Sequence, residues 1–406
     1  MPDKRKTVDS FIRMGTQSQD LLSFYKGKRV FLTGHTGFKG SWMTKILLDA
    51  GALVCGYSLK PPTNPNLFTL AELEKQPGLE HHIGDVCDLK HMKEVFGAFR
   101  PEFVIHMAAQ PIVRDSYRDP RGTYETNVMG TVNLLECVRL SVLPVNEGGM
   151  SDRKWDGVRS FLNVTTDKVY KNNEWYWGYR EDEPLDGYDP YSNSKSCSEL
   201  VTHAYKNSYF RHTDTAISTA RAGNVIGGGD FANDRIIPDC VRAIVEAKKK
   251  KKKQGEIIVR NMDSIRPYQH VLDPLFAYLM IAAKQYEDES YSGYYNVGPD
   301  ESDCATTGYM VLRFMSAWND LVDERNELSL SQLLPVLNMK HRPEENAPHE
   351  SNFLKLDCSK LKAVFNWSPV WDVDRALEET ARFTEVWLCG QSVPEEMERE
   401  IAEFLS

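Results

Sequence analysis

The feature that most constrains this sequence is a glycine-rich turn between a short apolar run and an amphipathic segment. Gly34, Gly37 and Gly40 are spaced three residues apart, directly after the run 29–33. In a strand–turn–helix unit the first glycine permits the tight turn, the second lets a phosphate approach the backbone, and the third lets the helix pack closely on the strand. The turn therefore predicts a nucleotide site in which amides at the start of a helix face a phosphate.

Further apolar runs alternate with helical patterns along the first half of the chain. Each run has the length of a strand, and segments with helical periodicity separate them. Strands that alternate with helices form parallel sheets with helices on both faces. We therefore predict an α/β fold, a Rossmann-type doubly wound parallel sheet, with a smaller C-terminal domain. The later predicted strands cover residues 53–59, 103–107, 161–165 and 216–221.

Charge and cysteine usage narrow the class of protein. The 406 residues carry 49 basic and 58 acidic side chains, a net charge of −9, so we expect no nucleic-acid partner. The eight cysteines form no C-x-x-C pair, and no signal-peptide pattern or 18-residue apolar stretch occurs. Reduced thiols, no membrane partner and a cytoplasmic location are expected. Six consecutive lysines at 248–253 are interpreted as a solvated loop rather than an anion-binding surface.

A tyrosine and a lysine four residues apart follow the predicted strand 161–165. On a helix, Tyr191 and Lys195 share one face, so both can reach one ligand. A neighbouring ammonium favours the phenolate and makes a tyrosine a usable base near neutral pH. Such a pair is common on surface helices, but after a glycine-rich turn it indicates a catalytic pair.

The residues near the predicted second and third strands leave two questions open. Asp85 could accept a hydrogen bond from an adenine amino group, or it could cap the helix that begins at Leu89. The second strand ends at Tyr57 and Ser58 without a carboxylate to hold a ribose 2′-hydroxyl, and Lys60 lies close by. The choice between NAD and NADP is therefore not decided by these residues.

Several longer stretches are similar to one known family. They are GKRVFLTGHTGFKGSW from Gly27, HMAAQP from His106, ETNVMGTVNLLE from Glu125, NVTTDKVYKNNEW from Asn163, GYDPYSNSK from Gly187 and RAGNVIGGGD from Arg221. On these stretches the chain from Lys26 to about Trp387 resembles the extended short-chain dehydrogenase/reductase superfamily, and within it the CDP-glucose 4,6-dehydratases. The TGHTGFKG turn and the Thr-Asp-Lys triplet carry the likeness to the cytidine-linked members.

The resemblance implies NAD as cofactor and CDP-glucose as substrate. The family's catalytic places fall on Thr166, Asp167, Lys168, Tyr191 and Lys195. Its cofactor-binding places fall on Gly34, His35, Thr36, Gly37, Phe38, Lys39, Gly40, Asp85, Val86, Ala108, Ala109, Tyr191 and Lys195. Its substrate-binding places fall on Gln110, Asn127, Arg221, Asn224, Arg235, Arg260 and Arg266.

Some of these residues also have structural interpretations. Asn127 could be buried and hydrogen-bonded to backbone, and Asn224 could cap a turn. Arg260 and Arg266 could flank a strand and pair with surface acids. His106 and His349 have no second ligand at a usable spacing, so no metal is expected.

The resemblance also implies a domain division and a homodimer. Residues 1–25 form an N-terminal extension, and residues 26–221, with a return segment at about 256–286, form the dinucleotide-binding domain. Residues 222–255 and 287–406 form a smaller sugar-nucleotide-binding domain. Relatives pair through two helices, which correspond here to 126–140 and 191–205, so an isologous four-helix contact is expected.

The same residues suggest a dehydration mechanism. Tyr191 takes the 4-hydroxyl proton as C4 is oxidised, and Thr166 steadies the oxygen. Asp167, kept protonated by its site, donates to the departing 6-hydroxyl, while Lys168 removes the C5 proton or, as an ammonium, stabilises the enolate. The alternatives are a sugar-nucleotide 4-epimerase with the same Tyr191 and Lys195, and a non-catalytic dinucleotide-binding protein.

Overall fold

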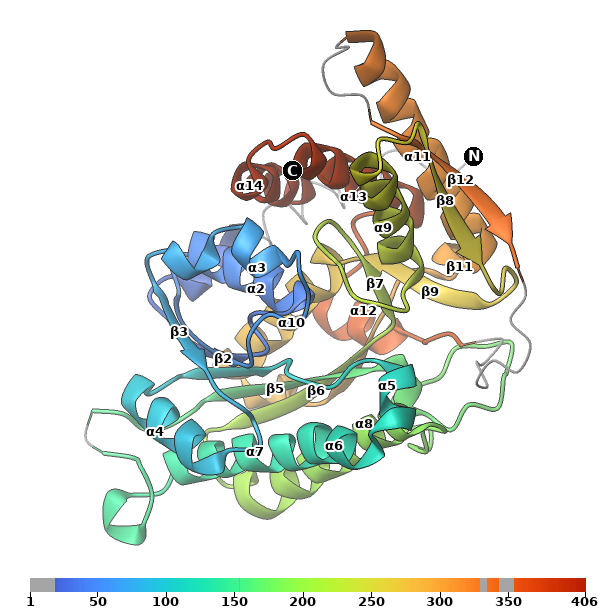
Figure 1. The fold of residues 1–406 in the computed structure, drawn as a ribbon. Helices are drawn as coiled ribbons and strands as arrows, with labels where there is room; N and C mark the ends of the chain where they lie inside the picture. Colours follow the sequence, from blue (N-terminus) through green and yellow to red (C-terminus); the bar gives the residue numbers. More distant parts are fainter. Residues whose placement is uncertain (1–18, 153, 329–333, 343–353) are drawn as a thin grey trace, which may run out of the picture.

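The computed structural model of the chain describes residues 19–152, 154–328, 334–342 and 354–406. Its main feature is a seven-stranded sheet in the order β10-β6-β5-β4-β1-β2-β3, with every neighbouring pair parallel (Figure 1). Its strands are β1 Arg29–Thr33, β2 Leu53–Ser58, β3 Leu79–Ile83, β4 Phe103–His106, β5 Ser160–Thr166, β6 Ala216–Ala222 and β10 Tyr294–Val297. The predicted α/β fold with a doubly wound parallel sheet is confirmed.

The strand order reverses beside β1. From β1 the sheet continues through β2 and β3 on one side, and through β4, β5 and β6 on the other. In open parallel sheets a crevice forms outside the carboxyl ends of the strands at such a switch point, and ligands bind there. The segments at this edge include the glycine-rich turn after β1, residues 107–110 after β4 and residues 166–168 at the end of β5.

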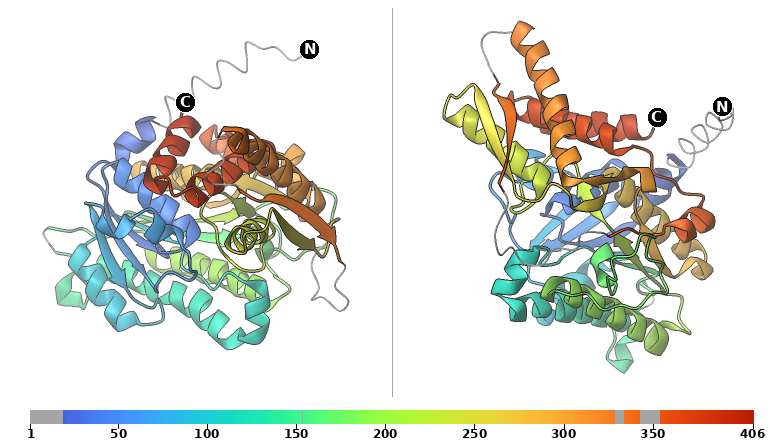
Figure 2. Two further views of the ribbon diagram at one scale, coloured as in Figure 1. Left: turned by 45° about the horizontal axis from the view of Figure 1, so that its top comes forward. Right: turned by 90° about the vertical axis from the view of Figure 1, so that its right-hand side faces the viewer.

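Helices cover both faces of the sheet (Figure 2). Val30 and Leu32 of β1 belong to one apolar core, and Phe31 belongs to another, because successive side chains of a strand point to opposite faces. Helices α2 Phe38–Asp49 and α10 Leu272–Glu287 pack in the first core. Helices α4 Leu89–Phe99 and α7 Gly130–Ser141 pack in the second, and α8 Pro190–Tyr205 lies against β5 on the same face.

A second region stands over the carboxyl edge of the sheet (Figure 1). It has a three-stranded sheet of β7 Asn224–Ile226, β9 Ile265–His270 and β11 Cys304–Thr306, and a pair of β8 Gln254–Val259 and β12 Val336–His341. The helices that share its core are α9 Ile236–Lys249, α11 Thr307–Leu328 and α13 Val373–Leu388. Other α-helices are α3 Leu67–Leu70, α5 Val113–Arg118, α6 Pro120–Tyr124, α12 Ser359–Phe365 and α14 Val393–Phe404, and residues 19–25 are also helical.

The chain crosses between the two regions at places that differ from those expected. The expected return segment, 256–286, supplies α10, which packs on β5 and β6, but its strands β8 and β9 join the small sheets. Strand β10, which lies beyond that segment, pairs with β6 in the main sheet. The division into two binding domains stays a prediction, and residues 1–18 of the expected extension lie outside the described residues.

The lysine run begins inside α9 and ends in the turn before β8. Lys248 Nζ donates to the carbonyl of Leu388, and Lys250 pairs with Glu246 at 3.1 Å. Cations near the last turn of a helix interact favourably with its dipole. In the part of the chain that is described, no helix is long and apolar enough to cross a bilayer.

Candidate active site

The glycine-rich turn has the geometry that its spacing predicts. Gly34 has φ +77°, and a Cβ there would lie 2.8 Å from the Ala108 backbone nitrogen. A Cβ at Gly40 would lie 2.0 Å from the Gly34 carbonyl oxygen, whereas one at Gly37 would meet only that oxygen, at 3.4 Å. Gly37 is the N-cap of α2, and no side chain caps the first amides. The turn therefore presents helix-start N–H groups on a side that a phosphate can approach closely.

The side chains of His35 and Thr36 fasten this turn to the sheet. His35 is fully buried, and its Nε2 lies 2.6 Å from His81 Nδ1 on β3. Burial lowers the pKa of His35 to about 3, so its imidazole is neutral. Thr36 Oγ1 lies 2.6 Å from Ser58 Oγ at the end of β2. Both residues, predicted to bind cofactor, can contribute through their backbone, while their side chains set the position of the turn.

Asp85 does not cap the helix that follows it. The N-cap of α4 is Asp88, whose carboxylate accepts the His91 N–H at 3.1 Å. Asp85 instead accepts the Cys87 N–H at 2.9 Å and stays exposed, while the next residue, Val86, is buried. The helix-cap interpretation is therefore wrong, and an adenine contact at Asp85 remains a prediction.

The loop after β4 is held by buried hydrogen bonds. Thr33 Oγ1 accepts the N–H groups of Met107 and Ala108 at 3.0 and 3.1 Å. Asn127 is buried, accepts the Gln110 N–H at 2.8 Å and donates to the Gln110 carbonyl at 3.1 Å. Asn127 therefore has the structural role that was the alternative to substrate binding. It positions the loop that contains the predicted site residues Ala108, Ala109 and Gln110.

His106 is also structural. Its Nδ1 lies 2.7 Å from Thr33 Oγ1 and its Nε2 lies 3.1 Å from Thr131 Oγ1, so both ring nitrogens have partners. Burial lowers its pKa to about 3. The other histidine considered for a metal, His349, lies outside the described residues.

Tyr191 and Lys195 lie on one buried face of α8. Asp189 caps this helix by accepting the Ser192 N–H at 3.0 Å, and Pro190 occupies its first turn. Lys195 Nζ donates to the Val164 carbonyl at 3.0 Å, and burial lowers its pKa to about 8. Burial raises the pKa of Tyr191 to about 12, against the opposing effects of Thr166 and Arg235. The expectation that neighbouring charge makes Tyr191 a base near neutral pH is thus not met by the protein groups alone, because desolvation of the phenolate outweighs them.

Residues 166–168, at the carboxyl end of β5, lie close to Tyr191. The Thr166 hydroxyl donates to Asp167 Oδ1 at 2.9 Å, and Thr166 also lowers the pKa of Tyr191. Asp167 is 1% exposed, and among the described residues no group is within hydrogen-bonding distance of its Oδ2. Burial raises the pKa of Asp167, although Lys168 and Arg266 oppose this. A buried carboxyl group with a raised pKa and a free oxygen is suited to carry a proton.

Lys39, in the glycine-rich turn, interacts electrostatically with Lys195 and Asp167. Its pKa falls to about 7 through burial and through the positive charges of Arg235 and Lys195, while Asp167 and Asp230 oppose the shift. The sequence placed Lys39 only in the cofactor turn. Its proximity to Tyr191 and Lys195 depends on how α2 packs against the sheet and α10, which the local sequence does not show.

The predicted substrate arginines do not all face the site. Arg221 is 3% exposed, and its guanidinium pairs with Glu199 at 3.0 Å and donates to Tyr170 Oη at 2.8 Å. Arg221, predicted to bind substrate, is therefore an interior residue, because β6 is covered on both faces. Glu199 was missed, although it follows Lys195 by four residues and therefore lies on the same helix face.

The other arginines lie closer to the carboxyl edge of the sheet. Arg266 is nearly buried on β9 and acts electrostatically on Asp167. Arg235, at the start of α9, pairs with Asp230 at 3.1 Å and influences both Tyr191 and Lys39. Two further predicted residues lie at the edge of this group. Arg260 is 3.6 Å from Asp234, and Asn224 is half-buried at the start of β7.

The fold and site together define a nucleotide-dependent enzyme of the dehydratase and epimerase class, with a glycine-rich turn, a Tyr-Lys pair and a buried carboxyl group near the carboxyl edge of one parallel sheet. Residues 31–380 match the GDP-mannose 4,6 dehydratase family, and the chain belongs to that family. It is 42% identical over 390 residues to a CDP-glucose 4,6-dehydratase of Salmonella typhimurium, covering 95% of this chain and 98% of the relative.

Two solved structures share the fold. The dTDP-glucose 4,6-dehydratase of Bacillus anthracis in complex with NAD aligns with a TM-score of 0.64 and 20% identity, covering 88% of this chain and 97% of that one. The UDP-glucose 4-epimerase of Thermotoga maritima with UDP-glucose gives the same TM-score and identity, over 89% and 99%. At this identity the alignments support the fold and do not separate dehydratase from epimerase.

Proposed function

We propose that the protein is an NAD-dependent CDP-glucose 4,6-dehydratase, a hydro-lyase that forms CDP-4-keto-6-deoxy-glucose. The observation that carries this proposal is Asp167, a buried carboxyl group with a raised pKa and an unpaired oxygen beside Tyr191. Elimination of water needs a proton donor to the departing oxygen, and burial shifts Asp167 toward its protonated form. The 42% identity to the Salmonella enzyme supports the nucleotide and the sugar.

Each candidate catalytic residue has a separate role in the proposed reaction. The glycine-rich turn would hold NAD, which would supply the acceptor for the C4 hydride and the source of its return to C6. Tyr191 takes the 4-hydroxyl proton, and we expect the Lys195 ammonium, four residues later on the same helix face, to favour the phenolate that burial opposes. Asp167 gives its proton to the leaving 6-hydroxyl, and Lys168 receives the C5 proton or stabilises the enolate. Thr166, which acts on the pKa of Tyr191, would hold O4.

The alternative reaction, epimerisation at C4, uses the same tyrosine and lysine. It needs neither a proton donor to O6 nor a base at C5, so it leaves Asp167 and Lys168 unexplained. A non-catalytic dinucleotide-binding protein would not need a buried Tyr191–Lys195 pair.

Incubation with NAD and CDP-, dTDP-, UDP- or GDP-hexose, followed by mass analysis, tests the proposal. Loss of one water from CDP-glucose alone is the expected result. An unchanged mass with inverted C4 supports the epimerase instead, and no turnover supports the binding protein. Turnover with NADP at equal concentration decides the cofactor, since no carboxylate ends β2.

We also infer a cytoplasmic homodimer. All eight cysteines are free thiols, as expected in a reducing compartment. The expected pairing helices lie side by side, and they or their π-helical extensions expose Met129, Leu200 and Tyr209 by 49%, 54% and 53%. Exposed apolar side chains that adjoin one another mark association surfaces, so these three residues are candidates for such a surface. Leu200→Asp should convert a dimeric mass in solution to a monomeric one, whereas a parent that is monomeric at micromolar concentration contradicts the dimer.

A further inference from the structure

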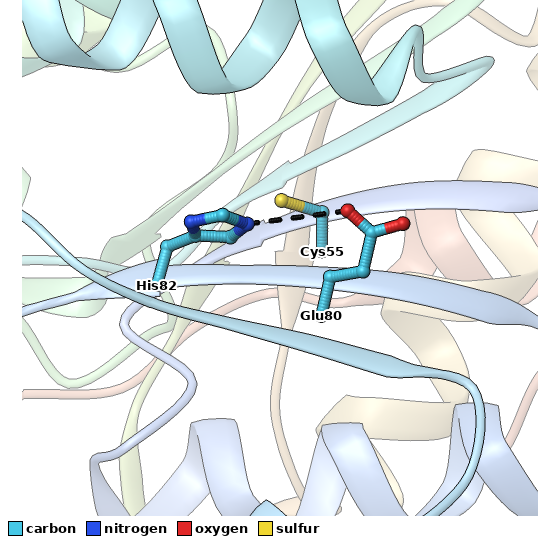
Figure 3. Close-up of side chains that lie close together, drawn as sticks. All are labelled: Cys55, Glu80 and His82. Carbon is cyan, nitrogen blue, oxygen red and sulfur yellow. Dashed lines mark ion pairs between the residues drawn. The ribbon is translucent and has the colours of Figure 1, made fainter.

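Three side chains that bind transition metals meet on one face of the sheet, away from the catalytic residues. Cys55 lies on β2, and Glu80 and His82 lie on the edge strand β3 (Figure 3). One ligand atom from each lies within 4.8 Å of the others, and His82 Nε2 is 3.9 Å from Glu80 Oε2. No metal was expected from the sequence, because the ligands come from two strands whose register was not known.

We propose that Cys55, Glu80 and His82 form a Zn²⁺ site. Thiolate, imidazole and carboxylate are the protein ligands that Zn²⁺ uses, and three of them leave a fourth position for water. With zinc–ligand bonds of about 2.0–2.3 Å, tetrahedral ligand atoms lie roughly 3.3–3.8 Å apart. The present spacing is therefore wider than in a loaded site by only about 1 Å. Side-chain rotation can close that gap, because the side chains of Glu80 and His82 are 57% and 37% exposed.

The strand register makes the arrangement specific. Cys55 is directly opposite Glu80 in the parallel β2–β3 pair, and Glu80 and His82 are two residues apart, so their side chains share a face. His81, between them, points to the opposite face and contacts His35. The thiol of Cys55 is buried, and its proton must leave to solvent as the sulfur–zinc bond forms.

The place of the site in the fold indicates what the ion would do. β3 is the last strand of the sheet and is hydrogen-bonded on one side only. A metal bridge would tie this edge strand to β2. It would lie beside Tyr57, which is opposite His82 and donates from its hydroxyl to the Asp85 carbonyl at 3.1 Å. Zinc should therefore stabilise the edge that carries the predicted adenine contact.

A second cluster, of three carboxylates, is less suited to bind a metal ion. Glu379, Glu396 and Glu400 are also close together and buried. Arg399 donates to both Glu379 and Glu396, and Arg375 pairs with Glu379. Guanidinium groups therefore neutralise the charge that would attract a cation.

Metal titration of the reduced, full-length protein tests the proposal. In competition with a chromophoric chelator, the parent should bind one Zn²⁺ per chain and gain thermal stability. With Co²⁺ in its place, a thiolate-to-cobalt charge-transfer band should appear in the near ultraviolet. His82→Ala and Glu80→Ala should weaken binding at least tenfold, and Cys55→Ser should abolish the cobalt band.

Matched variants separate this site from nonspecific binding. Cys137→Ser changes a buried thiol of the same apolar core, and His81→Ala changes the neighbouring histidine that faces away. Both should bind like the parent. If Cys55→Ser does not fold, the variants of the two partly exposed ligands on β3 decide the question. Absence of stoichiometric binding, or binding unchanged in His82→Ala and Glu80→Ala, overturns the proposal.

Discussion

At the scale of single residues, the proposed mechanism requires Tyr191 to be deprotonated and Asp167 to be protonated, although the two groups share one buried environment. Tyr191 must lose a proton, yet burial raises its pKa to about 12. Asp167 must keep one, and burial raises its pKa as well. Desolvation disfavours the charged form of either group. The same environment therefore favours the protonated form of Asp167 and makes deprotonation of Tyr191 depend on nearby positive charge.

Substitution of these two residues should therefore separate the two halves of the reaction. Tyr191→Phe should abolish the initial oxidation, because no group then takes the 4-hydroxyl proton. Asp167→Asn should slow elimination by roughly 10²–10⁴-fold, because an amide cannot deliver the proton. In single turnover with CDP-glucose, near-ultraviolet absorbance of NADH should build up only in Asp167→Asn. Elimination at the parent rate in that variant would show that Asp167 is not the acid.

The buried pair of Arg221 and Glu199 is an ionic contact without a direct part in this chemistry. Arg221→Met should cost about 3–5 kcal/mol in the free energy of unfolding, because it leaves Glu199 buried and unpaired. Urea denaturation measures this, and the double variant with Glu199→Gln should recover part of the loss. Parental stability together with a raised KM for the sugar nucleotide would instead support the substrate-binding role that the family resemblance implies for Arg221.

At the scale of elements, the unit β1–turn–α2 depends on different glycines for different reasons. Gly40→Ala would bring a Cβ to 2.0 Å from a backbone oxygen, so the helix must shift and the free energy of unfolding should fall by about 1–3 kcal/mol. Gly37→Ala should fold normally, since its Cβ meets only one atom, at 3.4 Å, but its methyl group would stand where a phosphate approaches.

Calorimetric binding of NAD, measured together with thermal unfolding, distinguishes the two variants. Gly37→Ala should lose affinity about tenfold or more with an unchanged unfolding temperature. If it instead loses stability and binds like the parent, the approach side of the turn has been assigned wrongly.

At the scale of the whole molecule, a buried acid ties α10 to the segment before α13. Asp273, in the first turn of α10, accepts the Val370 N–H at 2.7 Å, and burial raises its pKa to about 8. The unfolded chain loses this proton near pH ~4, whereas the folded protein keeps it to about pH 8. The contribution of this proton to stability is therefore fully present below pH ~4 and declines as pH rises toward 8.

This pH dependence of stability can be measured by comparing the parent with an isosteric variant. Between pH 5.5 and 7.5, chosen within that window, the parent should lose about 1 kcal/mol per pH unit relative to Asp273→Asn, whose amide does not titrate. Parallel denaturation curves at each pH give the difference directly. A difference that does not change with pH would mean that Asp273 is ionised throughout.

Local chemistry was enough to predict the parts of the molecule that lie within one turn of the chain. The glycine spacing, the Tyr191–Lys195 pair and the strand at 29–33 are contained in a few consecutive residues, so the sequence alone determined them. Strand β10 was missed because its four residues give no clear pattern and its partner, β6, is far away in the sequence.

Tertiary structure decided everything that depends on what covers a residue. Arg221 reads as an anion-binding arginine until the packing of β6 buries it against Glu199. Asp85 reads as a helix cap until Asp88 is seen to occupy that position. Cys55, Glu80 and His82 become neighbours only through the register of β2 with β3. Burial and register are set by contacts between distant segments, and these determine charge, pKa and ligand geometry. The sequence could therefore suggest candidate catalytic residues, whereas the environment that shifts their pKa values depends on the tertiary structure.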